Sequence, residues 1–336
     1  MPHISIDGTS LAFEQTEQHD SILRAGLGAG LGLPYECNSG GCGSCKFELL
    51  DGEVEDLWPE APGLSPRDRA KGRRLACQCR AVTDLRIKIR TGDEFRPLVR
   101  PRRMRATLTS RRQLTHDISE FTFKSAEPAR FLPGQYAMLR LANGTCVRAY
   151  SMSNLENDDG VWQFWIRRCA QGSFTPPLFD LLEASVVEID GPYGLAHLRP
   201  AGTRDVVCIA GGSGMSPMLS IVRGAAADPA YAGRRIHFFF GARTPADLCG
   251  QDEIAALAQT GARVTYLAAV SNPDSTDGWD GPTGYIHEVV RQALGDSLSA
   301  HECYLGGPPA MVEAVTRMLM LDCRVPPQQV HFDRFF

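Results

Sequence analysis

Apolar and polar residues alternate in short runs near the start of the chain, which predicts a β-rich module. The runs 3–6 and 11–13 flank Asp7-Gly8, a dipeptide that favours a tight hairpin turn. Further strands are expected over 47–50 and 85–89, and the even alternation of 85–89 is typical of an edge strand.

The middle of the chain keeps the two-residue period. Its strand-like segments are 117–123, 136–141 and 161–166. Short strands separated by turn residues predict an antiparallel barrel.

From Asp205 onward, continuous apolar runs alternate with stretches of helical periodicity. Continuous apolar runs are typical of strands that are buried on both faces, and their alternation with helices predicts a parallel α/β domain. The expected strands are 206–210, 236–240, 264–270 and 302–305, and the expected helices lie near 217–226, 252–259, 284–294 and 309–321.

A Pro- and Arg-rich stretch, Arg96-Pro-Leu-Val-Arg-Pro-Arg-Arg103, separates the first module from the rest. Prolines and like charges are typical of a linker. The predicted organisation is therefore a β-rich domain over 1–93, a linker over 94–103, a β-barrel over 104–200 and an α/β domain over 201–336.

Composition narrows the class of function. Of the 336 residues 43% are hydrophobic and 22% are charged, and the formal net charge of -4 gives no electrostatic reason to expect a nucleic-acid partner. No apolar run approaches the roughly 18 residues that cross a bilayer, and the N-terminus lacks the features of a secretory signal. Eleven cysteines, scattered outside one cluster, favour reduced thiols. We therefore expect a cytoplasmic protein with no membrane contact.

The chemistry centres on one glycine-rich loop. Cys37, Cys42 and Cys45 follow the pattern C-x4-C-x2-C, and Cys77 follows later within Leu-Ala-Cys-Gln. This is the thiolate spacing of a plant-type [2Fe–2S] site, and the loop glycines permit the sharp bend that it needs. A structural zinc site is the alternative, although zinc quartets usually come as two C-x2-C pairs.

Two cysteines are candidates for the fourth cluster ligand. Cys77 and Cys79 are two residues apart, so an extended strand would turn both side chains to the same side. Alternation alone does not decide between them.

A second glycine-rich segment, 209–217, ends the first buried strand and opens a helix. Gly212 and Gly214 permit a tight turn with bare amides at the helix N-terminus, where the helix dipole favours a pyrophosphate. The third glycine of the usual dinucleotide fingerprint is missing, so a turn without a ligand stays an alternative.

Two further segments carry groups suited to a flat, phosphorylated ligand. Arg148-Ala-Tyr-Ser151 offers an arginine for a phosphate, a tyrosine for a flat ring and a serine for a ring nitrogen. Thr175 is expected at a helix N-cap with Pro176 at the first helical position, which makes a second candidate phosphate site. Each segment alone also fits an ordinary strand or turn.

The order of these motifs resembles that of the iron–sulfur flavoprotein reductases that serve bacterial oxygenases. The FAD-domain signatures of that family resemble Pro133-Gly-Gln-Tyr136, Arg148-Ala-Tyr-Ser151, Gly172-Ser-Phe-Thr175 and Gly191-Pro-Tyr-Gly194. Its nicotinamide-domain signatures resemble Gly211-Gly-Ser-Gly-Met-Ser-Pro217, Phe240-Gly-Ala-Arg243 and Gly307-Pro-Pro309. In particular, the chain resembles the toluene monooxygenase reductase component at residues 34–43, Leu57-Trp-Pro59, 61–64 and 331–336.

The resemblance implies a multidomain α+β and α/β fold. Its parts would be a β-grasp ferredoxin domain, an antiparallel FAD-binding β-barrel and a parallel α/β nucleotide-binding domain. It also implies FAD, NADH and a [2Fe–2S] cluster, and the Leu-Ala-Cys-Gln context favours Cys77 over Cys79. The implied cluster ligands are Cys37, Cys42, Cys45 and Cys77.

The resemblance also implies roles for single residues. Arg148 would hold the FAD pyrophosphate, Tyr150 would stack on the isoalloxazine, and Ser151 would lie near the flavin N5. A terminal aromatic that shields the flavin corresponds to Phe335 or Phe336, although a hydrophobic anchor is the alternative; Ser151 and Phe336 are the expected catalytic residues. The other implied cofactor contacts are Ile166, Arg167, Gly172, Thr175, Gly212, Gly214, Arg243, Asp247, Gly307 and Pro308.

A flavin suits this arrangement because a nicotinamide gives up a two-electron hydride, whereas an iron–sulfur cluster takes one electron at a time. The expected path runs from NADH through FAD and the cluster to a Rieske-type ferredoxin or to the diiron hydroxylase of a toluene-type monooxygenase. The chain is expected to be a monomer. The alternatives are the reductase of a Rieske ring-hydroxylating dioxygenase and a redox-sensing iron–sulfur flavoprotein.

Two details concern the nicotinamide nucleotide. Gly306 stands where the family has a cysteine close to the nicotinamide, and Cys303 lies three residues too early to replace it, so hydride transfer is expected to be slower or differently tuned. Asp247 is the one acid of the loop 241–250, which also contains Arg243. A 2′-phosphate would meet like charge there, so a preference for NADH is expected.

Overall fold

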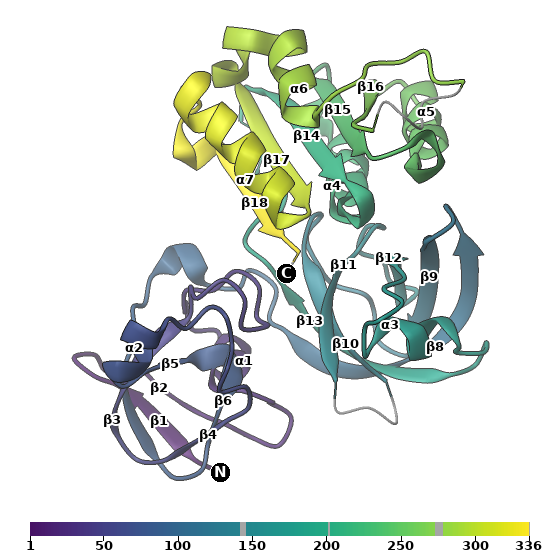
Figure 1. Cartoon of the computed structure of the whole chain (residues 1–336). Coiled ribbons are helices and arrows are strands. Elements are labelled where there is room, and N and C mark those ends of the chain that lie inside the picture. The colour runs from purple at the N-terminus through teal and green to yellow at the C-terminus, as the bar shows by residue number, and fades with distance from the viewer. Residues whose placement is uncertain (142–145, 201, 273–277, 336) are drawn as a thin grey trace. The chain divides into compact units, whose positions relative to one another are not determined.

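The computed structural model describes residues 1–141, 146–200, 202–272 and 278–335. The chain divides into two compact units, which are described separately (Figure 1). One unit comprises Met1–Met104 and Ile189–Leu195, and the other comprises Arg105–Glu188 and the residues from Ala196 onward.

The N-terminal unit is built around a five-stranded sheet in the order β2-β1-β7-β3-β5. The predicted hairpin is confirmed, because β1 and β2 pair antiparallel across Asp7-Gly8. The prediction of 85–89 as an edge strand is wrong, because β7 lies between β1 and β3. It alternates because the side chains on one of its faces are buried while those on the other face are exposed. The strands are β1 (His3–Ile6), β2 (Ala12–Glu14), β3 (Lys46–Asp51), β5 (Arg73–Leu75) and β7 (Leu85–Lys88).

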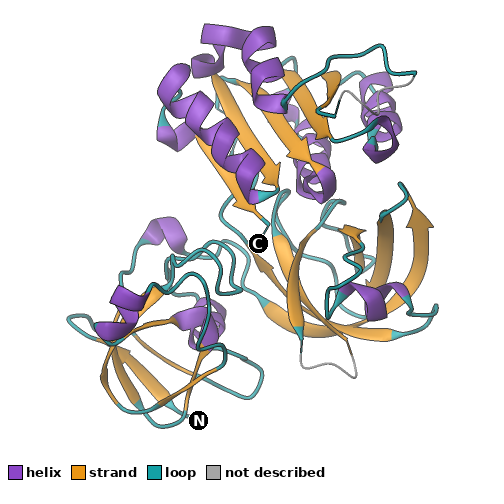
Figure 2. Cartoon of the chain, viewed as in Figure 1, coloured by secondary structure: helices purple, strands orange, loops and turns teal. Residues whose placement is uncertain are grey.

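Smaller elements complete this unit, and Figure 2 shows long loops between them. They are α1 (Ile22–Gly28), α2 (Pro66–Ala70), β4 (Val54–Asp56) and β6 (Cys79–Ala81). One turn of 3-10 helix, η1 (Ala76–Gln78), connects β5 to β6. This turn contains Cys77, one of the two candidates for the fourth cluster ligand.

A six-stranded sheet follows in the order β11-β10-β13-β8-β9-β12. Met152, just after β11, pairs antiparallel with Phe164 of β12, which joins the two edge strands and closes the sheet into a barrel. Strand β8 already begins at Arg102, inside the predicted linker, and the proposed domain boundaries stay a prediction. The elements are β8 (Arg102–Gln113), β9 (Ile118–Ser125), β10 (Tyr136–Leu141), β11 (Val147–Ser151), β12 (Val161–Arg167), β13 (Val186–Tyr193) and the short helix α3 (Thr175–Phe179).

The last part of the chain is a parallel sheet in the order β16-β15-β14-β17-β18, as predicted. Helices α4 and α5 cover one face and α6 and α7 cover the other (Figure 1). The strands are β14 (Asp205–Gly211), β15 (Arg235–Ala242), β16 (Arg263–Val270), β17 (His301–Gly307) and β18 (Val330–Arg334). The helices are α4 (Met215–Ala227), α5 (Gln251–Gln259), α6 (Ile286–Leu294) and α7 (Pro309–Arg317), which continues into a π-helical turn, Met318–Asp322.

Strand β18 is not predicted by the apolar pattern. It pairs with β17 at one edge of the sheet, and its sequence Val-His-Phe-Asp-Arg mixes buried and charged residues. An edge strand needs no continuous apolar run, which explains the difference.

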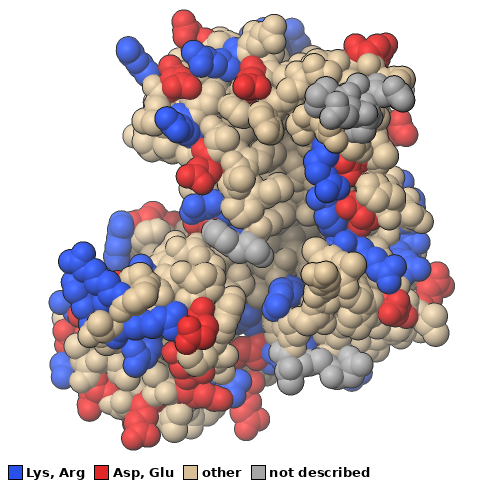
Figure 3. Space-filling view, viewed as in Figure 1, with Lys and Arg blue, Asp and Glu red and all other residues tan. Residues whose placement is uncertain are grey.

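The surface carries both signs of charge. Figure 3 shows acidic and basic side chains interspersed over the face that it draws. Among the described residues, no helix is long and apolar enough to cross a membrane.

Candidate functional site

The cysteines of the glycine-rich loop lie close to one another. The Cys37 and Cys42 sulfurs are 3.3 Å apart and share a hydrogen bond, which lowers the pKa of Cys37 to about 6. The backbone N–H groups of Ser39 and Cys42 donate to Cys37 Sγ over 3.5 and 3.3 Å, and that of Ser44 donates to Cys42 Sγ over 3.5 Å. Amide donors around sulfur favour the thiolate form that binds metal.

Cys77 joins the sulfurs of this loop. The η1 turn interrupts the strand between β5 and β6, so Cys77 and Cys79 do not lie on one continuous strand. A hydrogen bond with Cys45 and burial raise the pKa of the Cys77 thiol. Cys79 lies in β6 opposite Asp56, and burial raises its pKa to about 12. The structure therefore groups Cys77 with the loop.

Two glycines fix the shape of the loop. Gly40 and Gly43 have φ of +88° and +75°, where residues with a side chain are strained. A Cβ on Gly43 would lie 2.4 Å from the Gly63 carbonyl oxygen, and the Gly63 N–H donates to the Gly40 carbonyl over 2.9 Å. Thiols surrounded by backbone amides in a glycine-rich loop fit a [2Fe–2S] cluster, which transfers one electron at a time.

Strand β11 carries the residues predicted to hold the flavin. Arg148 is exposed, and its guanidinium donates to the Val147 carbonyl over 3.0 Å. Tyr150 packs against Phe174 with the ring centroids 5.6 Å apart, and burial raises the pKa of Tyr150. Ser151 is buried at the end of the strand. Arg148 forms no ion pair within the part of the chain that the structure describes, so its charge is available to a phosphate.

Helix α3 begins one residue earlier than predicted. Thr175 is its first residue, and the N-cap position is Phe174, so the prediction that Thr175 caps the helix is wrong. The Thr175 hydroxyl instead accepts from the Cys169 N–H over 2.9 Å and donates to the Cys169 carbonyl over 3.1 Å. The Gly172 N–H donates to the same carbonyl over 2.9 Å. Thr175 and Gly172 thus fasten one loop, and their contact with a phosphate stays a prediction.

The connection from β14 to α4 is a tight turn with φ of +56° at Gly212. A Cβ there would lie 3.1 Å from the guanidinium nitrogens of Arg167, which follows the buried Ile166 at the end of β12. The positive end of the α4 dipole lies at this turn. Arg167 adds charge, although Asp117 lies 3.0 Å from its Nε. The turn therefore suits a diphosphate.

Ser216, in the first turn of α4, is a residue that sequence reasoning does not single out. Its buried hydroxyl donates to the Ser151 carbonyl over 2.7 Å and accepts from the Trp165 N–H over 3.2 Å. One turn further along, Ser220 donates to the Asn154 carbonyl over 2.7 Å. Two serines spaced i, i+4 among buried apolar helix residues were the available signal. Together they fasten the start of α4 to the barrel.

The position of the missing family cysteine is tightly packed. A Cβ on Gly214 would lie 1.9 Å from the Gly306 carbonyl oxygen, and one on Gly306 would lie 3.1 Å from the Gly214 carbonyl oxygen and 3.2 Å from Pro217 Cγ. A cysteine at 306 would therefore require the first turn of α4 to shift by a few tenths of an ångström. Cys303 does not replace it, because it is buried on the face covered by α6 and α7, where burial raises its pKa to about 12.

The C-terminus lies at the edge of the sheet where β17 ends. Pro308 precedes α7 as its N-cap, and the Phe335 N–H donates to the Gly307 carbonyl over 3.1 Å. Since β14 and β17 are parallel neighbours, the Gly212 turn lies at this same edge. The structure thus brings Phe335 to the same edge of the sheet as the Gly212 turn, and Phe336 lies outside the described residues.

Arg243 and Asp247 form a pair within their loop. Arg243 Nη2 donates to Asp247 Oδ1 over 3.0 Å, and Asp247 Oδ2 accepts from the N–H and the hydroxyl of Thr244 over 3.0 and 3.1 Å. Burial would raise the pKa of the Asp247 carboxyl, but these hydrogen bonds hold it below its ordinary value. Both carboxylate oxygens are therefore used inside the loop, while Arg243 stays largely exposed.

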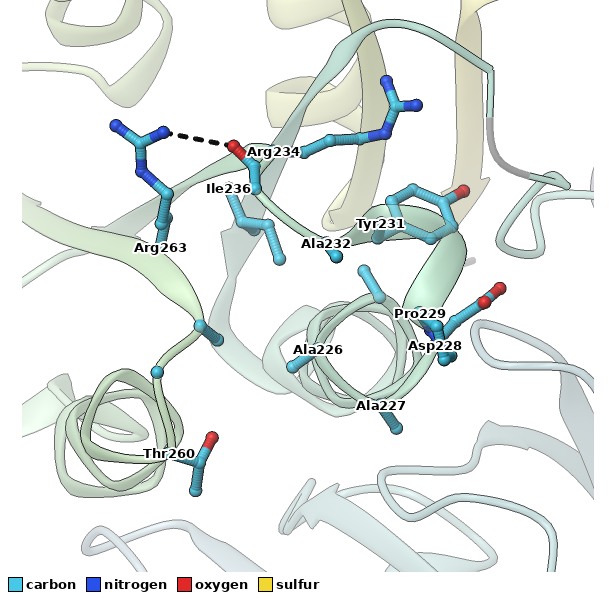
Figure 4. A pocket seen from close by; sticks show the side chains of 14 residues that line it. Ala226, Ala227, Asp228, Pro229, Tyr231, Ala232, Arg234, Ile236, Thr260 and Arg263 are labelled. Carbon is cyan, nitrogen blue, oxygen red and sulfur yellow. Dashed lines mark hydrogen bonds between the residues drawn. The ribbon is translucent and has the colours of Figure 1, made fainter.

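A pocket of about 310 Å³ lies at the opposite edge of the same sheet (Figure 4). Its walls come from the end of α4 and the starts of β15 and β16, and the Arg263 guanidinium donates to the Gly233 carbonyl over 3.1 Å beside it. None of the predicted cofactor residues lines this pocket.

These parts define the class of an iron–sulfur flavoprotein reductase. Residues 4–82 match the 2Fe-2S iron-sulfur cluster binding domain, residues 105–198 the oxidoreductase FAD-binding domain, and residues 208–317 the oxidoreductase NAD-binding domain. The first match decides between a [2Fe–2S] cluster and structural zinc in favour of the cluster.

Full-length relatives place the chain more narrowly. It is 41% identical to the ferredoxin–NAD(+) reductase component of the alkene monooxygenase system of Xanthobacter autotrophicus, with 98% of each chain covered. It is 33% identical to the xylene/toluene monooxygenase electron transfer component XylA of Pseudomonas putida, covering 99% of this chain and 93% of that one. A solved ferredoxin reductase in carbazole 1,9a-dioxygenase shares 40% identity at a TM-score of 0.90, covering 100% of this chain and 98% of that one.

The chain belongs to the family of ferredoxin–NAD(P)+ reductase components of oxygenase systems. It is an NADH-dependent oxidoreductase that carries electrons through FAD and a [2Fe–2S] cluster to the ferredoxin or oxygenase of a multicomponent system. The predicted fold class, cofactors and reductase activity are confirmed. The roles of single residues stay predictions.

Cys79→Ser is expected to leave the cluster absorbance and the paramagnetic signal of the reduced protein unchanged, because Cys79 lies in β6 while Cys77 contacts the loop sulfurs. Cys77→Ser is the matched variant and should lose the cluster or change its signal strongly. Visible and electron paramagnetic resonance spectra of both purified variants check this. Retention in Cys77→Ser together with loss in Cys79→Ser would show that the ligand set is wrong.

Proposed function

We propose that the chain is the reductase of a toluene-type diiron monooxygenase and that it delivers single electrons from its cluster to the ferredoxin or hydroxylase of that system. The observation that carries this proposal is full-length similarity to two monooxygenase reductases. The local resemblance of 34–43, Leu57-Trp-Pro59 and 331–336 supports the toluene type.

The proposal assigns roles to the residues of the site. Arg148 holds the FAD pyrophosphate, Tyr150 packs on the isoalloxazine and Ser151 lies near the flavin N5. The exposed guanidinium of Arg148 and the partly buried ring of Tyr150, which packs against Phe174, support this assignment. The turn at Gly212 and Gly214 holds the nicotinamide nucleotide. The chain acts as a monomer, with the cluster bound by Cys37, Cys42, Cys45 and Cys77.

The acceptor protein has a candidate docking feature beside the cluster loop. Trp58 is 43% exposed and Leu57 is 39% exposed, which is unusual for large apolar side chains. A Cβ on Gly40 would lie 3.1 Å from Trp58 Cε3, so this indole packs directly against the cluster loop. A partner that covers Trp58 would bring its own redox centre close to the cluster.

A Rieske ring-hydroxylating dioxygenase is the second candidate partner. The observation that favours it is the structural similarity, over the whole chain, to the ferredoxin reductase in carbazole 1,9a-dioxygenase. Measurements with the acceptor proteins of each system distinguish the two candidates.

Reconstitution with each acceptor tests the proposed partner. With NADH, kcat/KM for the remaining components of a toluene-type monooxygenase should exceed that for a Rieske dioxygenase ferredoxin by about tenfold, or about 1.4 kcal/mol of docking preference. Ferricyanide reduction serves as the acceptor-independent control. Trp58→Ala should lower kcat/KM for the acceptor protein and leave ferricyanide reduction unchanged. The opposite order of the two acceptors would favour the dioxygenase.

NADH should be preferred over NADPH by roughly tenfold to a hundredfold, because Asp247 neutralises Arg243, the base closest to it in the loop. Asp247→Ala frees that charge for a 2′-phosphate and should narrow the ratio of kcat/KM between the two nucleotides. Asp252→Ala, in the first turn of α5, is the matched control. Comparable kcat/KM for both nucleotides in the unmodified protein, or an unchanged ratio in Asp247→Ala, would refute this role.

A further inference from the structure

Two histidines and an aspartate meet at the amino edge of the parallel sheet, away from the nucleotide turn. Asp205, His237 and His301 lie near the starts of β14, β15 and β17, which are adjacent strands. One nitrogen of each imidazole and one carboxylate oxygen lie within 4.8 Å of one another. Strand register accounts for this, because His301 pairs with Asp205 and His237 pairs with Val207, so all three side chains leave the same face.

The hydrogen bonds of the two imidazoles use the Nδ1 atom of each ring, which leaves the two Nε2 atoms for a metal ion. His301 Nδ1 lies 2.7 Å from the Ser297 carbonyl, which can only accept, so this nitrogen carries the proton. His301 is buried, and its Nε2 has no hydrogen-bond partner in the described structure. His237 Nδ1 lies 3.1 Å from the Thr265 hydroxyl, which leaves the Nε2 of His237 as the nitrogen for a metal ion. A second hydrogen bond that fixes the tautomer is typical of metal-binding histidines.

Asp205 completes the set. Its Oδ1 accepts from the Arg235 N–H over 2.9 Å and its Oδ2 accepts from Arg235 Nε over 2.8 Å. A carboxylate has about four lone-pair positions, so each oxygen keeps one for another partner. The Arg235 charge weakens cation binding but is mostly exposed and therefore screened.

We propose that Asp205, His237 and His301 form a binding site for a divalent transition-metal ion, with zinc as its natural probe. Two imidazoles, one carboxylate and a water are a common zinc donor set. Tetrahedral ligands lie about 3.3 Å apart, so the three atoms, which lie within 4.8 Å of one another, must close by up to about 1.5 Å. Metal binding gives the buried Nε2 of His301 a partner and joins the starts of three strands. The site is about 20 Å from the nucleotide turn, since strands rise about 3.3 Å per residue.

Zinc counting on the holoenzyme tests the site. The protein with FAD and cluster is dialysed against zinc chloride, and zinc is counted by mass spectrometry beside the thermal unfolding midpoint. His301→Gln and His237→Gln should each bind one zinc fewer per chain, with affinity at this site reduced at least about tenfold and the zinc-induced rise in midpoint lost. His287→Gln, in α6 of the same domain, is the matched control and should behave like the unmodified protein.

Zinc K-edge absorption separates this site from the cysteines. It should show nitrogen and oxygen neighbours that disappear in His237→Gln, whose side chain is partly exposed and therefore tolerant of substitution. Unchanged ferricyanide reduction shows that each variant is folded. The same zinc count in all three histidine variants, sulfur neighbours alone, or no bound zinc would overturn the proposal.

Discussion

The position of α4 against the barrel depends on one buried hydroxyl, which forms hydrogen bonds to two strands at once. Ser216 donates to the Ser151 carbonyl and accepts from the Trp165 N–H, so the first turn of α4 is held on the ends of β11 and β12. Both backbone groups are inside the protein, and a buried group left without a partner costs about 1–3 kcal/mol. This bridge therefore keeps the turn at Gly212 and Gly214 beside β11, the strand that carries Tyr150.

Glycine packing completes that constraint. The turn that precedes α4 and the end of β17 approach so closely that Gly214 has no room for a Cβ beside the Gly306 carbonyl. Glycine at 306 suits this packing, because a side chain there would lie too close to Gly214 and Pro217 unless they shifted slightly.

Much of the fold and of the candidate site could be predicted from the sequence. The cysteine spacing predicts the cluster, because few loops bring three thiols so close. The change from alternating to continuous apolar runs predicts the barrel and the parallel sheet.

The predictions were wrong where one sequence pattern fits two structural environments. A central strand with one exposed face alternates like an edge strand, as β7 shows. Thr175 has the sequence of a cap, yet its hydroxyl binds Cys169. Ser216 required three-dimensional pairing, which periodicity does not encode.

Anaerobic stopped-flow mixing with NADH tests the central claim that the Ser216 bridge fixes the start of α4 against β11, where the proposed function puts the nicotinamide nucleotide and the flavin. In Ser216→Ala, the rate constant for the loss of flavin absorbance should fall about tenfold, which corresponds to about 1.4 kcal/mol in the barrier. Ser220→Ala removes a similar hydrogen bond one turn away and should change this rate constant less. The intrinsic rate constant for one-electron transfer from the reduced flavin to the cluster should be unaffected in both variants. A rate constant in Ser216→Ala equal to that of the unmodified protein, with the same flavin content, would contradict the account.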